Sequence, residues 1–180
     1  MHLMKSMSIR QMLIHRFFYD PLFRHLPIDS VLDVGAGNGK MIDYFTEIGK
    51  KITAIDLHPT RKDIHKMDIL KNRIPSNSYD LVYSAHLIEH LHDPETFAHE
   101  LMRISKKYVC IVAPLPGKRF WDQPDHLRPY TQETLKRTFH LNGWIKGFEL
   151  NFPGLEPIAI ILFDKADSRI STIHQDPQKN

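Results

Sequence analysis

Three closely spaced glycines constrain the fold of this chain more than any other feature. They lie in residues 31–39, Val-Leu-Asp-Val-Gly-Ala-Gly-Asn-Gly. The apolar, β-branched residues before them predict a buried parallel strand, and the glycines allow positive φ angles and close approach of a ligand. From Met41, apolar residues recur at helical spacing up to Gly49, which suits the end of a helix. Strand, glycine turn and helix are typical of the nucleotide- or nucleoside-binding start of a doubly wound sheet.

The spacing of the glycines narrows the class of ligand. A dinucleotide fingerprint reads G-x-G-x-x-G, but counted from Gly35 its last position is Lys40. The chain has G-x-G-x-G instead, with Asp33 two residues before the first glycine, and no G-K-[ST] follows, which excludes a P-loop. Residues 51–56 predict a second strand that ends in Asp56. A carboxylate at that strand tip can accept both hydrogen bonds of a ribose diol.

The glycine turn resembles motif I of the class I S-adenosylmethionine-dependent methyltransferases, which reads hydrophobic-hydrophobic-D/E-hydrophobic-G-x-G-x-G. Residues 75–91, which include Tyr-Asp-Leu-Val-Tyr-Ser-Ala-His-Leu-Ile-Glu-His-Leu, are similar to the region after motif I in the type 11 methyltransferases. The resemblance covers residues 28–164. It implies an α/β, Rossmann-like class I methyltransferase sheet of order 3-2-1-4-5-7-6, with the last strand antiparallel and helices on both faces.

Two further segments flank this expected domain. Residues 1–27 carry apolar side chains at helical spacing and predict an N-terminal helix, either packed on the sheet or acting as a lid over the acceptor. Residues 165–180 are polar, and we expect a disordered tail. Between the second and third strands, the connection from Asp56 to Ile64 is too short for a full crossover helix.

The resemblance implies S-adenosylmethionine as the cofactor and a set of residues that bind it. It assigns Asp33 to the methionine amino group, Asp56 to the ribose and Asp68 to the adenine amino group. An ordinary turn-capping role remains the alternative for Asp56 and Asp68. The other implied contacts are the methionine arm (Gly35, Ala36, Gly37), the adenine (Leu57, His58, Ile69) and the surroundings of the transferable methyl (Ser84, Ala85, His86).

Twelve histidines raise the question of a metal site. His86-Leu-Ile-Glu89-His90 matches H-x-x-E-H, the inverted zinc-peptidase pattern. However, the motif follows a predicted strand, Pro94 soon starts a different helix, and the third ligand has no distinctive candidate. We therefore expect no metal. His90 either orders its loop or faces the acceptor as a base, for which a histidine pKa is suited.

Residues 114–130 predict a long connection after the fifth strand, at the edge of the sheet where ligands bind. We expect His126 and His90 to approach the methyl group there as candidate catalytic residues. The residues expected to hold a flat or anionic acceptor are Trp121, Arg119, Arg128 and Tyr130. The alternative is that Arg128 and Tyr130 anchor the loop to the sheet.

Composition limits the remaining classes. A chain of 180 residues predicts one domain, and a net charge of +3 is small for a general nucleic-acid binder. The single cysteine, Cys110, permits no intramolecular disulfide and suits a reducing cytoplasm, and no apolar run approaches the roughly 18 residues of a membrane span.

The sequence does not identify the methyl acceptor. No N/D-P-P-Y/F sequence follows the fourth strand, which removes the usual signature of amine methylation on nucleobases. We expect a small metabolite or lipid-like acceptor. The alternatives are an RNA or protein acceptor, or a catalytically silent cofactor-binding subunit, and the oligomeric state stays open.

Overall fold

A computed structural model describes residues 15–140, 146–151 and 157–165. Its strands are β1 (Ser30–Val34), β2 (Lys51–Asp56), β3 (Ile64–Lys66), β4 (Tyr79–Ala85), β5 (Ser105–Pro114), β6 (Lys146–Leu150) and β7 (Ile158–Asp164). They form one sheet of order β3-β2-β1-β4-β5-β7-β6. The first five strands are parallel, β7 runs antiparallel to β5, and β6 runs antiparallel to β7. The predicted strand order is confirmed.

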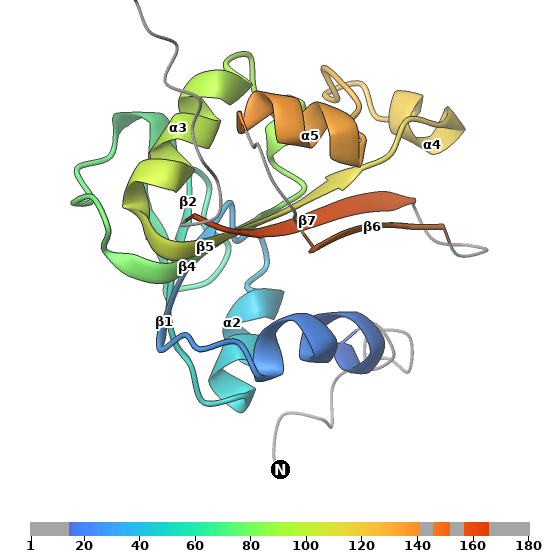
Figure 1. Ribbon diagram of the computed structural model, residues 1–180. Helices are drawn as coiled ribbons and strands as arrows, with labels where there is room; N and C mark the ends of the chain where they lie inside the picture. The colour runs from blue at the N-terminus through green and yellow to red at the C-terminus, as the bar shows by residue number, and fades with distance from the viewer. Residues whose placement is uncertain (1–14, 141–145, 152–156, 166–180) are drawn as a thin grey trace, which may run out of the picture.

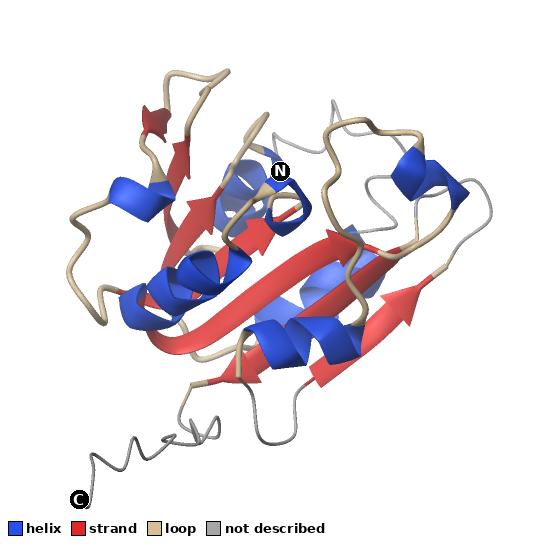
Figure 2. Cartoon of the chain, turned by 90° about the horizontal axis from the view of Figure 1, so that it is seen from above, coloured by secondary structure: helices blue, strands red, loops and turns tan. Residues whose placement is uncertain are grey.

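Helical segments cover both faces of this sheet. They are η2 (His15–Arg24), α2 (Lys40–Glu47), η3 (Ile69–Lys71), η4 (Ile88–His90), α3 (Pro94–Ile104), α4 (Lys118–Trp121) and α5 (Gln132–Thr138). In Figure 1, α3 and α5 lie on one face of the sheet, and α2 lies with η2 on the other. Figure 2 shows the strands side by side beneath α3 and α5. This is the three-layer arrangement expected of a doubly wound fold.

Side chains that alternate along the strands belong to two separate hydrophobic clusters. In β1, Leu32 and Val34 join the cluster that includes α3 and α5, whereas Val31 joins the cluster that includes α2 and η2. Cys110 belongs to the second cluster and is fully buried, as expected of a core residue. Because side chains alternate across a strand, a sheet covered on both faces needs apolar residues at nearly every position. This explains the continuous apolar runs of the central strands.

Local sequence signals explain several helix ends. The Asp93 carboxylate accepts a hydrogen bond from the backbone N–H of Thr96, and Pro94 takes the first helical position of α3. Thr131 caps α5 in the same manner. Gly49 follows α2 with φ +76°. Asn142-Gly143 predicts a later end for α5 than the structure shows, since α5 ends at Thr138 with Phe139 as its C-cap.

The apolar runs predict the third, fourth and fifth strands at residues 64–67, 81–85 and 108–113, and the boundaries in the structure differ. The structure begins β4 at Tyr79 and β5 at Ser105, because Tyr79 and Ser105 still pair across the sheet. β3 ends at Lys66, one residue before the predicted limit. As predicted, the short connection between β2 and β3 contains no helix.

The N-terminal segment η2 packs against the sheet. It is a π-helix with Pro21 inside it, and a proline lacks the N–H that a regular helix interior needs. Phe23 is completely buried, with its ring 5.2 Å from Phe45 and 5.9 Å from Tyr83. The packing interpretation fits these residues; the rest of the proposed lid, residues 1–14, lies outside the described part. Within that part, no helix has the length and apolar character needed to cross a membrane.

Candidate functional site

The glycine turn between β1 and α2 is held in shape by the strand ends. Gly35 has φ +75° and Gly37 has φ +54°, values that disfavour other residues. The N–H groups of Gly35 and Ala36 both donate to the Ile55 carbonyl, at 2.9 and 3.1 Å. A Cβ on Gly35 would lie 2.8 Å from Leu87, whereas one on Gly37 would meet open space. The turn therefore packs against the segment after β4 and leaves room for a ligand beside Gly37.

Asp56 lies at the tip of β2, as predicted. Its Oδ2 accepts a hydrogen bond from the Gly37 N–H at 2.8 Å, and its Oδ1 accepts one from the His58 N–H at 2.7 Å. The backbone N–H groups of Gly35, Ala36 and Gly37 are thus all used within the protein. They shape the turn and do not point to a ligand as free donors.

Asp33 is a buried carboxyl group at the end of β1, 3% exposed. Burial, with a smaller contribution from the charge of Asp56, raises the pKa of Asp33 from 3.8 to about 7. A buried carboxylate is costly without a positive partner. The methionine amino group of S-adenosylmethionine would supply such a cation, so this position fits the expected cofactor.

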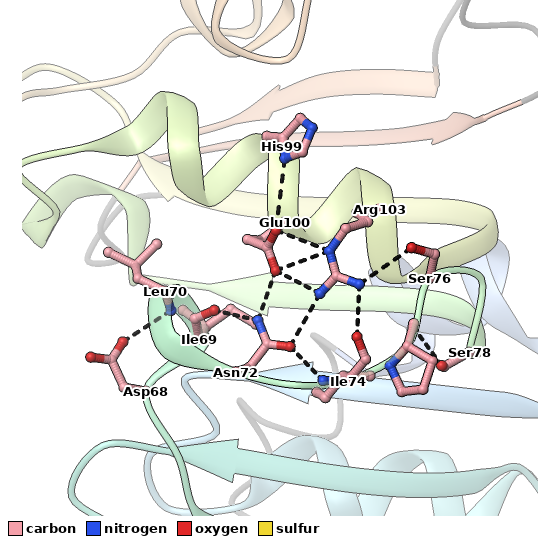
Figure 3. Close-up of polar contacts among 11 residues, drawn as sticks. Asp68, Ile69, Leu70, Asn72, Ile74, Ser76, Ser78, His99, Glu100 and Arg103 are labelled. Carbon is pink, nitrogen blue, oxygen red and sulfur yellow. Dashed lines mark hydrogen bonds and ion pairs between the residues drawn. The ribbon is translucent and has the colours of Figure 1, made fainter.

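A polar network fixes the segment after β3 (Figure 3). Arg103 of α3 pairs with Glu100 at 2.7 Å, and Asn72 donates to Glu100 at 2.8 Å. At the start of the segment, Asp68 caps η3 by accepting from the Leu70 N–H at 2.9 Å. One oxygen of Asp68 therefore caps the turn, which is the alternative role that the sequence left open for this residue. Its contact with adenine stays a prediction, as do those of Leu57 and His58, which follow Asp56 in the chain and are both exposed.

The end of β4 lies next to β1. The Ser84 hydroxyl donates to the Val34 carbonyl at 2.8 Å in a buried position, so it joins the two strands. His86 takes φ +53°, and its N–H donates to the Val112 carbonyl at 2.9 Å. This left-handed residue interrupts the chain before η4, so His86 and His90 do not share a helical face. The H-x-x-E-H residues here therefore match the sequence pattern of an inverted zinc peptidase but do not have its geometry.

The connection after β5 contains a short helix, α4, that the sequence analysis did not predict. Trp121 at its end is 63% exposed and stands edge-on to the buried Phe120, with ring centroids 4.8 Å apart. The His126 ring lies 4.9 Å from that of His90. The Leu127 N–H donates to the Glu89 carbonyl at 2.8 Å. The two candidate catalytic histidines are thus neighbours, brought together by the contact between this connection and η4.

Two of the expected acceptor residues occupy anchoring positions. Arg128 donates to the His92 carbonyl at 3.4 Å. Tyr130 is 3% exposed and belongs to the cluster beneath α3 and α5, so its side chain is not on a surface that an acceptor could reach. Both observations favour the anchoring alternative for these residues. The side chain of Arg119 lies outside the described part of the chain.

Sequence reasoning missed the burial of Glu89. Its side chain is completely buried, and neither carboxylate oxygen accepts a hydrogen bond from any residue that the structure describes. Glu89, His90 and His126 each offer an atom that could ligate a metal, and these atoms lie within 4.8 Å of one another. The only sequence signals were Glu89-His90 after β4 and Asp125-His126 in the next loop. Their proximity depends on loop packing, which no local pattern encodes.

The comparisons with known proteins agree with this geometry. The family described as methyltransferase domain matches residues 32–112, which run from within β1 to within β5. No curated protein matches the sequence. The match shows a methyltransferase domain at residues 32–112, and the sheet order is that of the class I fold. Solved methyltransferases that share this fold use S-adenosylmethionine.

Solved structures share the fold at low sequence identity. A SAM-dependent methyltransferase from Archaeoglobus fulgidus is 21% identical with a TM-score of 0.65, over 85% of this chain and 91% of that one. The 1,6-didemethyltoxoflavin-N1-methyltransferase of Burkholderia thailandensis, solved with 1,6-didemethyltoxoflavin and S-adenosylhomocysteine, is 16% identical with a TM-score of 0.62, over 75% and 70%. A methyltransferase in complex with the Haloferax volcanii Trm112 activator is 14% identical with a TM-score of 0.60, over 83% and 90%.

Proposed function

We propose that this enzyme methylates a small metabolite or lipid-like acceptor bound between η4 and the connection after β5. One observation carries the proposal. Trp121, 63% exposed, belongs to the same connection that brings the His126 ring 4.9 Å from His90. A flat, exposed aromatic in the same connection as one of two neighbouring imidazoles suits a small acceptor with a flat or apolar part.

The residues of the chain have distinct roles in this proposal. S-adenosylmethionine supplies a methyl group already activated by its positively charged sulfur. Asp33 faces the methionine amino group, and Asp56 holds the ribose. Leu87 packs on Gly35, so the glycine turn and η4 adjoin. Alignment and removal of water are then the main contributions of the protein, and His90 or His126 accepts a proton where the acceptor must lose one.

Two further points support a small acceptor. The net charge of +3 gives no strong field for a nucleic acid. The Burkholderia thailandensis enzyme, which shares the fold, was solved with the small heteroaromatic molecule 1,6-didemethyltoxoflavin. The fold itself hosts many acceptors, so the argument depends mainly on the surface around Trp121.

The experiment is transfer of a labelled methyl group from S-adenosylmethionine into a cell extract. We expect a labelled product of low molecular mass that resists nuclease and protease. The Asp56→Ala variant serves as the matched control, because it retains the acceptor surface but loses the expected ribose contact. A product sensitive to nuclease or protease would replace the small acceptor by RNA or protein, and no transfer above the control would favour a silent subunit.

A further inference from the structure

Glu89 is an acidic side chain without the partners that burial demands. It is 0% exposed, and no described residue donates a hydrogen bond to either oxygen. Two ring nitrogens face its Oε1, with His86 Nδ1 at 3.5 Å and His90 Nε2 at 3.9 Å. Removing a carboxylate from water without a donor or cation is strongly unfavourable. A positive ligand at this position would remove that cost.

His90 and His126 are oriented to bind such a ligand. Nδ1 of His90 lies 3.1 Å from the Asp125 carbonyl oxygen, and Nδ1 of His126 lies 3.1 Å from the Phe120 carbonyl oxygen. Because a carbonyl can only accept, each Nδ1 must carry the hydrogen. Each neutral ring then presents its Nε2 lone pair. Metal-binding histidines typically have this arrangement, with the second ring nitrogen donating to a carbonyl or carboxylate.

We propose that Glu89, His90 and His126 bind a divalent transition-metal ion. One ligand atom from each lies within 4.8 Å of the other two. Ligands around a tetrahedral zinc ion lie roughly 3.5 Å apart, since each bond is about 2.0–2.2 Å long, so small side-chain rotations would close the set. Two imidazoles and one carboxylate favour Zn²⁺, Mn²⁺ or Fe²⁺ over Mg²⁺ and Ca²⁺, which prefer oxygen ligands.

Packing holds the three ligands in place from two different loops. Glu89 and His90 come from η4 after β4, and His126 comes from the connection after β5. The Leu127 N–H donates to the Glu89 carbonyl at 2.8 Å, and the His126 ring packs on the buried Phe120 at 4.5 Å. Asp125 Oδ2 lies 3.2 Å from His90 Nδ1 and supports the same ring orientation. The sequence offered no distinctive third ligand, and the fold supplies His126 in that role.

The proposed metal site also narrows the chemical class of the acceptor. Three protein ligands leave at least one coordination position open, as in catalytic metal sites. This step rests on the proposed function, with the ion in the place of the imidazole base, because the ion occupies the Nε2 lone pairs of His90 and His126. Where the acceptor binds beside η4, the ion would orient an acceptor that carries an oxygen ligand, such as a hydroxyl or carboxylate, and would favour loss of a hydroxyl proton to water. The acceptor class is therefore a small oxygen-bearing molecule with a flat or apolar part.

The test is metal binding by the full chain after treatment with a chelator. Titration calorimetry with Zn²⁺ and Mn²⁺ should give one ion per chain, with much weaker binding of Mg²⁺. Glu89→Gln and His126→Ala should each weaken Zn²⁺ affinity by at least about tenfold. His99→Ala is the matched control, because His99 is 76% exposed on α3 and stands beside Glu100 outside the cluster; its affinity should equal that of the unchanged protein.

Thermal unfolding gives a second readout that does not depend on activity. Zn²⁺ should raise the Tm of the unchanged protein and of His99→Ala but not that of Glu89→Gln. Glu89→Gln should itself unfold no earlier than the metal-free protein, since it removes a buried charge. Absence of stoichiometric binding, or equal binding in all variants, would overturn the proposal. Methyl transfer by a protein that shows no stoichiometric metal binding would reject this site and retain the proposed function, whereas metal binding without transfer to any acceptor would do the reverse.

Discussion

The backbone N–H of Gly37 donates a 2.8 Å hydrogen bond to Oδ2 of Asp56, which joins the glycine turn to the tip of β2. The other oxygen is held by the His58 N–H at 2.7 Å. The carboxylate is therefore oriented by two backbone donors. Each carboxylate oxygen can accept more than one hydrogen bond, so capping the turn and binding a ribose are compatible roles for Asp56.

Replacing Asp56 should weaken cofactor binding. Asp56→Ala removes two charge-assisted bonds to the ribose, each worth about 1.5–2 kcal/mol. We expect S-adenosylhomocysteine affinity, measured by calorimetry, to fall by roughly 10²- to 10³-fold. Asp63→Ala is the control, since Asp63 is an exposed acid on the same connection that pairs with Arg61 at 2.7 Å. Unchanged affinity in Asp56→Ala would refute the ribose assignment, and tight NAD binding would contradict the cofactor.

Cofactor binding should release a proton from Asp33. Its pKa is raised to about 7, chiefly by burial, and the cationic amino group of the ligand lowers it again. At pH 6 the free enzyme therefore carries the proton in about 0.9 of molecules, and at pH 7.5 in about 0.2. Calorimetry in buffers of different ionisation enthalpy should measure the release of these amounts. Asp33→Asn should bind more weakly and release no proton by this route; the same release in Asp33→Asn would show that another group is responsible.

The same pKa predicts a pH dependence of stability. A carboxyl with a native pKa of about 7 and an ordinary value of 3.8 binds more protons in the folded than in the unfolded state across that interval. The free energy of unfolding of the free enzyme should therefore decrease from this source as pH rises from about 4 to 7. Urea denaturation should show a shallower decrease over that interval in Asp33→Asn. An identical slope in both proteins would be inconsistent with the raised pKa.

Asp80 should change the pH dependence of stability in the opposite direction, because its pKa is lowered. Burial raises its pKa, but hydrogen bonds from the Asp29 and Ser30 N–H groups and from Lys107 outweigh this and lower it to about 2. Its contribution to stability is therefore complete above about pH 4 and is lost as pH falls to 2. Asp80→Asn should lower the free energy of unfolding by about 2 kcal/mol at pH 7, by the same linkage. The difference should shrink toward pH 2, and exposed Asp29→Asn should have little effect at either pH.

The positions of Asp33, the glycine turn and Asp56 could be predicted because they are encoded locally, whereas their contacts with the cofactor stay predictions. Asp33 and Gly35 are neighbours in the chain, and Asp56 ends the adjacent parallel strand, so the sheet alone brings them to one edge. The short connection before β3 and the capping of α3 followed from chain length and from residues at one turn. The full strand order came from the resemblance to a known family, since periodicity does not order strands.

The acceptor half was less predictable because it depends on how two loops pack. Residue type alone did not show that Tyr130 is buried beneath α3 and α5, or that Glu89 is buried without a hydrogen-bond donor among the described residues. The contact between His90 and His126 was expected only in outline. It results from the hydrogen bond that joins Leu127 to Glu89, two residues 38 positions apart (89 to 127).

Substitutions in the connection after β5 should change acceptor binding and turnover but leave cofactor affinity unchanged. Trp121 is exposed, so Trp121→Ala removes an aromatic surface without disturbing the core. We expect KM for the acceptor to rise by about 2- to 12-fold, as for loss of one aromatic contact of about 0.5–1.5 kcal/mol, with kcat little changed. His126→Ala should instead lower kcat by roughly 10²-fold or more, the range for loss of a positioned proton acceptor.

Both variants should bind S-adenosylhomocysteine like the unchanged protein, because neither residue contacts the glycine turn or Asp56 in any described interaction. Gln123→Ala is the control for the connection, since Gln123 is exposed between the two residues and its N–H donates to the Phe120 carbonyl through the backbone alone. Steady-state kinetics on the acceptor found by labelling, with calorimetry on the cofactor, measures both effects. Normal transfer by Trp121→Ala and His126→Ala, or loss of cofactor affinity in both, would mean that the acceptor does not bind against this connection.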